Sequence, residues 1–269
     1  MGWPAPSPAA APGMTWAIFD GQPVDALVTT RGGGVSDGPY ASLNLGLHVG
    51  DDPGRVHENR QRAAAALGLE LSDLVFGAQA HGRKVAVVDA AHRGRGSVAL
   101  EDAVADVDAL VTATPGVGLV ALVADCVPLV LYEPVAQVVA CVHAGWRGTV
   151  ARVVDAAVLA MGSLGARPER ILAGIGPAIA PDRYKVGPEV ADAVLACFAG
   201  PATDLVWPDG TGRWHLDLVA ANHRTLIEAG VPEANIEACG VATGEGTPFF
   251  SDRTVRPCGR FAALAALRP

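Results

Sequence analysis

The segment Gly118–Val150, GLVALVADCVPLVLYEPVAQVVACVHAGWRGTV, decides the fold of this chain. It contains two apolar runs rich in β-branched residues, which predict two buried strands. The first run leads into Asp125 and Cys126, and the second continues through His143 to Arg147. A carboxylate, a thiol, an imidazole and a guanidinium are poor choices for a core, so these strand ends predict a reactive site.

The flanking sequence predicts a mixture of strands and helices. Apolar residues at helical spacing predict helices near residues 53–67, 150–161, 188–198 and 218–229. Short apolar runs predict strands near residues 26–30, 74–79, 85–89, 107–112, 171–175, 235–239 and 261–267, with a hairpin turning at 209–210. Because strands and helices intermix without a repeat, we predict an α/β (α+β) sandwich of mixed β-sheets with flanking helices.

Composition narrows the class of protein. Of the 269 residues, 50% are hydrophobic and 18% are charged, which excludes a wholly disordered chain. The formal net charge of −8 argues against a nucleic-acid partner, and no apolar run is long enough for a membrane span. The five cysteines show no short paired spacing, which favours a reducing compartment. We therefore expect a soluble, cytoplasmic protein.

Domain organisation is predicted to be simple. Residues 1–14, MGWPAPSPAAAPGM, are rich in Pro and Ala and predict a disordered extension, in which Met14 is an alternative start. Residues 15–269 contain no clear linker and predict one catalytic domain. A helix expected to begin at Gly148-Thr149 would point its amide groups towards the face of His143 and Arg147.

Two glycine-rich stretches bear on phosphate or dinucleotide binding. Arg31-Gly32-Gly33-Gly34 either forms an anion-binding loop or is a flexible turn, and composition alone favours the turn. The spelling G-V-G-L-V-A at 116–121 matches a dinucleotide fingerprint. A β-branched run follows it where a helix should begin, so we discount NAD binding.

His81, Cys126 and His143 form a three-ligand set that suits Zn²⁺ and leaves a fourth position open. Asp125 could then act as general acid or base. The ligands are far apart in sequence and form no short motif, so alternatives stay open from the residues alone. Cys126 could be a nucleophile paired with a histidine, or the set could bind copper. Copper is disfavoured because no methionine lies near these residues.

A further alternative is that the thiols and histidines are ordinary core groups. For Cys141, inside the run Val138–Val142, we adopt that interpretation.

Taken together, the motifs resemble the YfiH/YlmD family, which has been called polyphenol oxidase or laccase-like and also purine nucleoside phosphorylase. The resemblance spans about residues 25–267. It is carried by Thr30–Ser36 (TRGGGVS), Ser42–Gly46 (SLNLG), Gln79–Gly82 (QAHG), Ala124–Pro128 (ADCVP), His143–Thr149 (HAGWRGT), Gly176–Ile179 (GPAI) and Phe249–Ser251 (FFS).

The resemblance implies a monomeric sandwich with a catalytic Zn²⁺ held by His81, Cys126 and His143. It implies phosphorolysis of adenosine, inosine, guanosine and methylthioadenosine to the base and ribose 1-phosphate, together with deamination of adenosine. The expected partners are therefore a purine nucleoside and phosphate. A bacterial branch of the family is connected with the editing of peptidoglycan precursors that carry L-serine (UDP-MurNAc-L-Ser).

Roles for individual residues follow from the matched blocks. Asp125, Cys126 and His143 are the expected catalytic residues. The expected substrate-binding residues are Arg31, Asn44, Arg147, Ser251 and Arg260, with Arg31 and Arg147 on phosphate. The tail departs from the family pattern, because Cys239-Gly240 and Ser251-Asp252-Arg253-Thr254 replace its usual runs.

Three hypotheses follow: a zinc-dependent phosphorylase and deaminase, a hydrolase that edits a cell-wall precursor, and a copper- or zinc-binding protein related to laccases.

Overall fold

The computed structural model describes residues 13–198 and 201–268, and its central element is a six-stranded mixed sheet. The order of its strands is β14-β9-β7-β8-β5-β4. The strands are β4 (Val85–Val87), β5 (Ala109–Thr112), β7 (Val127–Glu133), β8 (Val138–Ala144), β9 (Leu172–Ile175) and β14 (Ile236–Ala238). The antiparallel pair β7–β8 comes from the segment Gly118–Val150, as the apolar runs predict.

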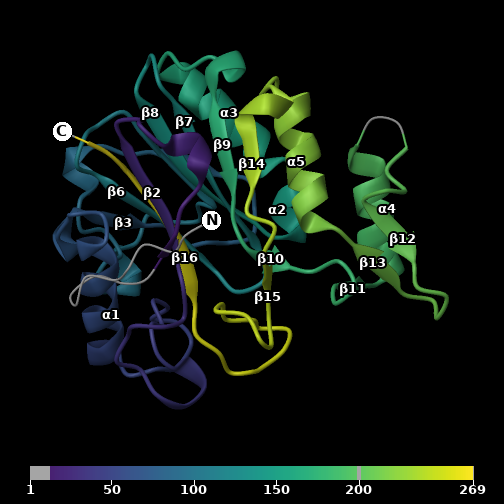
Figure 1. Cartoon of the computed structure of the whole chain (residues 1–269), viewed down its shortest axis with the longest axis horizontal. Coiled ribbons are helices and arrows are strands. Elements are labelled where there is room, and N and C mark those ends of the chain that lie inside the picture. The colour runs from purple at the N-terminus through teal and green to yellow at the C-terminus, as the bar shows by residue number, and fades with distance from the viewer. Residues whose placement is uncertain (1–12, 199–200, 269) are drawn as a thin grey trace.

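A second sheet of five strands contains the last strand of the chain, with the order β1-β2-β16-β6-β3. Its strands are β1 (Gly13–Met14), β2 (Val24–Thr29), β3 (Leu74–Phe76), β6 (Gly118–Val123) and β16 (Phe261–Leu267). Strand β16 pairs antiparallel with both β2 and β6. Figure 1 shows the purple β2 and the yellow β16 side by side, although they lie at opposite ends of the sequence.

The two sheets pack face to face, and helices cover their outer faces (Figure 1). The helices are α1 (Pro53–Ala65), α2 (Trp146–Val150), α3 (Val153–Ser163), α4 (Pro188–Cys197) and α5 (Leu218–Glu228). Helix α1 packs on the five-stranded sheet, and α3 and α5 pack on the six-stranded sheet. The predicted sandwich of mixed sheets with flanking helices is confirmed.

This layering explains why the central strands are apolar throughout. In β7, Leu129 and Leu131 belong to the core beneath the helices, while Val130 and Tyr132 belong to the core between the sheets. A strand buried on both faces has no polar side, so its sequence does not alternate.

Two small sheets complete the chain. One contains β11 (Lys185–Val186), β12 (Val206–Pro208) and β13 (Trp214–Leu216), and the other pairs β10 (Ala178–Ile179) with β15 (Ala242–Thr243). Strands β12 and β13 are antiparallel, which confirms the hairpin predicted at 209–210. The sheet of β11, β12 and β13 lies with α4 at the right edge of Figure 1.

Two expectations need correction. The helix expected to begin at Gly148-Thr149 begins at Trp146 and ends at Val150, because Arg152 adopts a left-handed φ of 65° and separates α2 from α3. Of the segment expected to be a disordered extension, Gly13 and Met14 instead pair with Thr29 and Val28, and residues 1–12 lie outside the described residues.

All five cysteines are free, as their spacing predicts. Within residues 13–198 and 201–268, no helix has the length and apolar character needed to cross a membrane.

Candidate metal centre and active site

A pocket of about 770 Å³ opens beside the ends of β6, β7 and β8. This volume suits a small organic ligand. Its lining comes from segments far apart in sequence: the loop after β3, the turn between β6 and β7, the start of α2, and the tail before β16. The turn between β6 and β7 and the start of α2 both belong to Gly118–Val150, which therefore provides two sides of the pocket.

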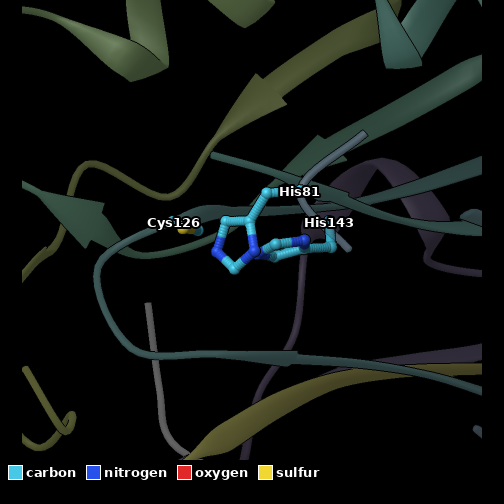
Figure 2. Close-up of side chains that lie close together, drawn as sticks. All are labelled: His81, Cys126 and His143. Atoms are coloured by element: carbon cyan, nitrogen blue, oxygen red, sulfur yellow. The ribbon is translucent and has the colours of Figure 1, made fainter. Parts of the chain in front are cut away.

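His81, Cys126 and His143 meet in this pocket. One potential ligand atom from each residue lies within 4.8 Å of the other two. Figure 2 shows the three side chains directed towards one another, and the two imidazole rings meet edge to face with centroids 4.7 Å apart. His81 has a positive φ of 59°, Cys126 lies in the turn before β7, and His143 lies near the end of β8.

Asp108, just before β5, supports both histidines. Its Oδ1 accepts hydrogen bonds from the backbone N–H of His81 at 2.9 Å and lies 2.8 Å from Nδ1 of His143. Its Oδ2 accepts from the backbone N–H of Gly82 at 2.6 Å. The side chain is fully buried, and these hydrogen bonds keep the pKa of its carboxyl low although burial alone would raise it. The bond to Nδ1 leaves Nε2 of His143 free to act as a ligand.

The thiol and the imidazole of the cluster influence each other electrostatically. Burial opposes ionisation of Cys126, but the positive charge of His143 and hydrogen bonding to His143 and His81 lower its pKa. Burial likewise opposes protonation of His143, but the negative charge of Cys126 and the hydrogen bond to Asp108 raise its pKa. The site therefore favours a thiolate, which is the form that binds metals.

Asp125 stands beside the cluster and connects it to two later segments. Its Oδ1 accepts a hydrogen bond from Oγ1 of Thr243 at 2.6 Å, and its Oδ2 accepts from the backbone N–H of Arg253 at 2.7 Å. Its backbone has a positive φ of 90°. The carboxylate is thus fixed in orientation next to Cys126.

The predicted substrate-binding residues divide into two groups. Arg147 and Arg260 line the pocket, and the guanidinium of Arg147 lies 4.5 Å from the ring centroid of Trp146. Arg31, Asn44 and Ser251 are not part of the lining.

These three residues instead organise the surrounding backbone. Nε of Arg31 donates to the carbonyl of Ala41, and the hydroxyl of Ser251 bonds to Thr254. The Oδ1 of Asn44 accepts from the backbone N–H of Arg260 at 2.8 Å.

Sequence reasoning missed several lining residues, among them His48, Arg60 and Tyr184. Arg60 carried a signal, because helical spacing places it beside Val56 and Ala63 on the buried face of α1, where an arginine is unusual. Burial, together with the negative charge of Cys126, raises the pKa of Tyr184 to about 12. No comparable pattern marked His48 or Tyr184.

The donor set fits a zinc ion better than a copper centre. One sulfur and two nitrogen donors leave a fourth tetrahedral position for water or substrate. A blue-copper centre usually adds a weak axial methionine, but neither Met14 nor Met161 lines the pocket. Both belong to hydrophobic cores instead.

Several known proteins are similar to this chain over most of its length. The chain is 43% identical over 231 residues to "Adenosine deaminase RL5" from an unknown prokaryotic organism, covering 86% of this chain and 88% of the relative. It is 43% identical over 239 residues to "Purine nucleoside phosphorylase ORF3" of Streptomyces griseus, covering 89% and 92%. The crystal structure of YlmD from Geobacillus stearothermophilus matches with a TM-score of 0.91 and 37% identity over 97% of both chains.

A family model described as multi-copper polyphenol oxidoreductase laccase matches residues 25–268. This span contains the cluster, Asp108, Asp125 and both pocket-lining arginines predicted from the sequence. The chain therefore belongs to this laccase-like family, which includes YlmD and YfiH.

Proposed function

We propose that this chain is a zinc-dependent purine nucleoside phosphorylase that also deaminates adenosine. The observation that carries the proposal is the convergence of His81, Cys126 and His143 in a pocket of about 770 Å³. The names of the two relatives given above, a purine nucleoside phosphorylase and an adenosine deaminase, support both activities. The proposed substrates are adenosine, inosine, guanosine and methylthioadenosine.

The mechanism assigns roles to residues in the pocket. His81, Cys126 and His143 would hold the zinc ion, which would act as a Lewis acid when bound. Trp146 and Tyr184 offer aromatic surface to the purine.

Asp125 is the proposed proton carrier. In deamination it takes a proton from the attacking water and passes it to the departing amine; in phosphorolysis it takes a proton from the attacking dihydrogen phosphate and passes it to the departing base. The hydrogen bonds from Thr243 and Arg253 hold its carboxylate in place without reorganisation during the reaction.

The decisive experiment is a chromatographic screen of nucleosides with and without phosphate, using purified zinc-loaded protein. We expect ribose 1-phosphate and free base only when phosphate is present, and conversion of adenosine to inosine without phosphate. If no purine nucleoside is turned over, the proposal fails. The same screen includes UDP-MurNAc-L-Ser, whose hydrolysis would instead favour the cell-wall hydrolase.

A copper oxidase is the second candidate, since the family description names one. A multi-copper enzyme needs several metal sites, but the part of the chain that the structure describes contains one His/Cys/Asp/Glu group suited to a metal. Metal analysis of the purified protein distinguishes the two, and we expect zinc at one ion per chain.

We also propose that residues 15–269 act as one catalytic domain and as a monomer. Light scattering of the purified protein measures the mass that tests the second point.

A further inference from the structure

Arg60 is a buried cation without a partner of opposite charge. It is 1% exposed on α1 and donates hydrogen bonds only to backbone carbonyls: from Nε to Leu45 at 2.8 Å, and from Nη1 to Gly96 at 2.7 Å and Ser97 at 2.9 Å. Its guanidinium also lies 3.9 Å from the ring centroid of Phe76. Among the described residues, no carboxylate forms a salt bridge with it.

Arg60 retains both its charge and spare hydrogen-bonding capacity. Burial lowers its pKa to about 9, so the guanidinium remains charged at neutral pH. The three hydrogen bonds use Nε and Nη1, and Nη2 makes none to a described residue. Because Arg60 lines the pocket, a ligand there can accept from Nη2.

Two other basic side chains share this part of the pocket, His48 and Arg260. Burial lowers the pKa of His48, and the charges of Arg260, Arg60 and His81 lower it further, so His48 lies within electrostatic range of both arginines and of the metal cluster. Asp252 only partly neutralises Arg260, because its carboxylate lies 3.2 Å from Nη2 of Arg260 and also pairs with Arg256.

The local backbone is shaped to hold Arg260. Asn44 anchors its backbone N–H, and a Cβ on Gly46 would lie 2.9 Å from its Cγ. Glycine at position 46 therefore allows the arginine to pack closely against this loop.

The whole lining has an excess of positive charge. Five arginines line the pocket (Arg60, Arg147, Arg253, Arg256 and Arg260), against three aspartates (Asp106, Asp125 and Asp252). The chain as a whole has a net charge of −8, so the pocket has the opposite sign to the molecule. Such a pocket concentrates anions.

We propose that Arg60, Arg260 and His48 form a binding subsite for a phosphoryl group, in the same pocket as the metal cluster and next to it. Nη1 and Nη2 of Arg260 already donate to the protein, but Nε of Arg260 and the imidazole of His48, like Nη2 of Arg60, form no hydrogen bond to a described residue. These groups provide N–H donors for phosphate oxygens, and arginine suits such oxyanions geometrically. The phosphoryl group is either inorganic phosphate or the phosphate of a sugar ester. The inference deepens the proposed phosphorolysis and rests on it for its biological meaning, but binding is testable separately.

The first test locates an anion in the unmodified protein. Crystals of the zinc-loaded protein soaked in tungstate, a heavy mimic of phosphate, should show an anomalous peak between Arg60, Arg260 and His48. A peak only elsewhere in the pocket, or none, overturns the inference. This test does not depend on whether any variant folds.

The second test is kinetic, and it compares Arg60 with Arg62, a second arginine on α1. Arg60→Lys and Arg260→Met should each raise the phosphate KM about tenfold to a hundredfold, as expected for loss of a charged hydrogen bond. Arg62→Met is the control, because Arg62 lies two residues from Arg60, pairs with Glu58 and does not line the pocket. Equal phosphate KM values in all four proteins would overturn the subsite.

Competition distinguishes the two sources of the phosphoryl group. Calorimetry measures the binding of each anion. If inorganic phosphate still binds in the presence of saturating inosine, the subsite holds the co-substrate. If ribose 1-phosphate binds and inorganic phosphate does not, the subsite holds the phosphate of the ester. If the anion binds at the subsite but no phosphorolysis occurs, the subsite stands and the proposed phosphorylase fails. If phosphorolysis occurs but the anion binds elsewhere, the subsite fails.

Discussion

At the scale of single residues, Cys126 and His143 each stabilise the charged form of the other. The pKa of Cys126 is lowered and that of His143 is raised, so the metal-free protein favours the pair of thiolate and imidazolium. Metal binding then displaces the proton from His143, since an imidazole must be neutral to act as a ligand.

This coupling predicts a thiolate at neutral pH. Metal-free protein at pH 7 should show the ultraviolet absorbance of a thiolate near 240 nm, whereas an ordinary thiol with a pKa of about 8.5 is mostly protonated at that pH. Because the pKa is lowered, the band should disappear only as the pH falls below neutrality. Cys126→Ser supplies the baseline, and a band that appears only above pH 8 would contradict the prediction.

Asp108 is predicted to act as a positioning residue. Asp108→Asn keeps the shape but removes the charge that orients His143 and the backbone of His81, so zinc affinity should fall about tenfold to a hundredfold. Competition with a chromophoric chelator measures the affinity. Asp106→Asn is the control, because Asp106 is an exposed neighbour that pairs with Lys84; equal losses in both variants would argue against a specific role.

Residue identities in the cluster were predictable because His81, Cys126 and His143 lie in distinctive blocks at strand ends. The supporting role of Asp108 was not predictable, since nothing in the run Val107–Thr112 indicates which side chain faces the cluster. The side chains of Arg31 and Asn44 bond to the local backbone, and their expected contact with substrate stays a prediction. A polar residue in a characteristic motif is thus as easily a loop anchor as a ligand contact.

At the scale of elements, the start of α2 decides how closely the ligands approach. Its cap, Gly145, follows β8 directly, and a Cβ there would lie 2.9 Å from Sγ of Cys126 and 3.1 Å from Cδ2 of His81. The loop can pass the cluster only without a side chain at this position.

Gly145→Ala should therefore displace the ligands and abolish stoichiometric zinc binding, while the protein still folds. Metal content and circular dichroism of the purified variant check both parts. Gly162→Ala is the matched control, because a Cβ there meets nothing within 4 Å and alanine favours the helix. Full zinc occupancy in Gly145→Ala would contradict the steric argument.

Element bounds were predictable wherever local chemistry determines them. Asp52 caps α1 through the backbone N–H of Arg55, and the final strand spans residues 261–267 as its apolar run predicts. The break between α2 and α3 was not predictable, since the apolar spacing continues through Arg152 while its backbone turns left-handed. Tertiary packing overrides the local pattern there.

At the scale of the whole molecule, stability depends on strands buried on both faces. Leu264 in β16 is fully buried beneath α1, whereas Leu159 in α3 is 71% exposed. Leu264→Ala should lower the free energy of unfolding by about 2–5 kcal/mol, because it removes a large side chain from a core that cannot fully close. Leu159→Ala should change it by less than about 0.5 kcal/mol. Denaturant unfolding measures both, and similar losses would refute this account of the layers.

The layered sandwich was predictable as a class, because apolar strands without alternation need cover on both faces. The pairing of strands was not predictable, since β16 inserts between β2 and β6 and nothing local to Phe261–Leu267 specifies those partners. The pocket depends on the same long-range assembly. Asp125, for example, meets Arg253 across 128 positions of sequence.

The central position of β16 also has a consequence for synthesis of the protein. Strands β2 and β6 emerge from the ribosome long before the strand that joins them, so the five-stranded sheet stays open until β16 is synthesised. Contacts between such distant segments slow folding, and unpaired strand edges favour aggregation. Until β16 has emerged, the nascent chain therefore exposes two apolar strand edges. Chaperones that shield such edges should improve the yield of this protein more than that of a protein whose sheets close in the order of synthesis.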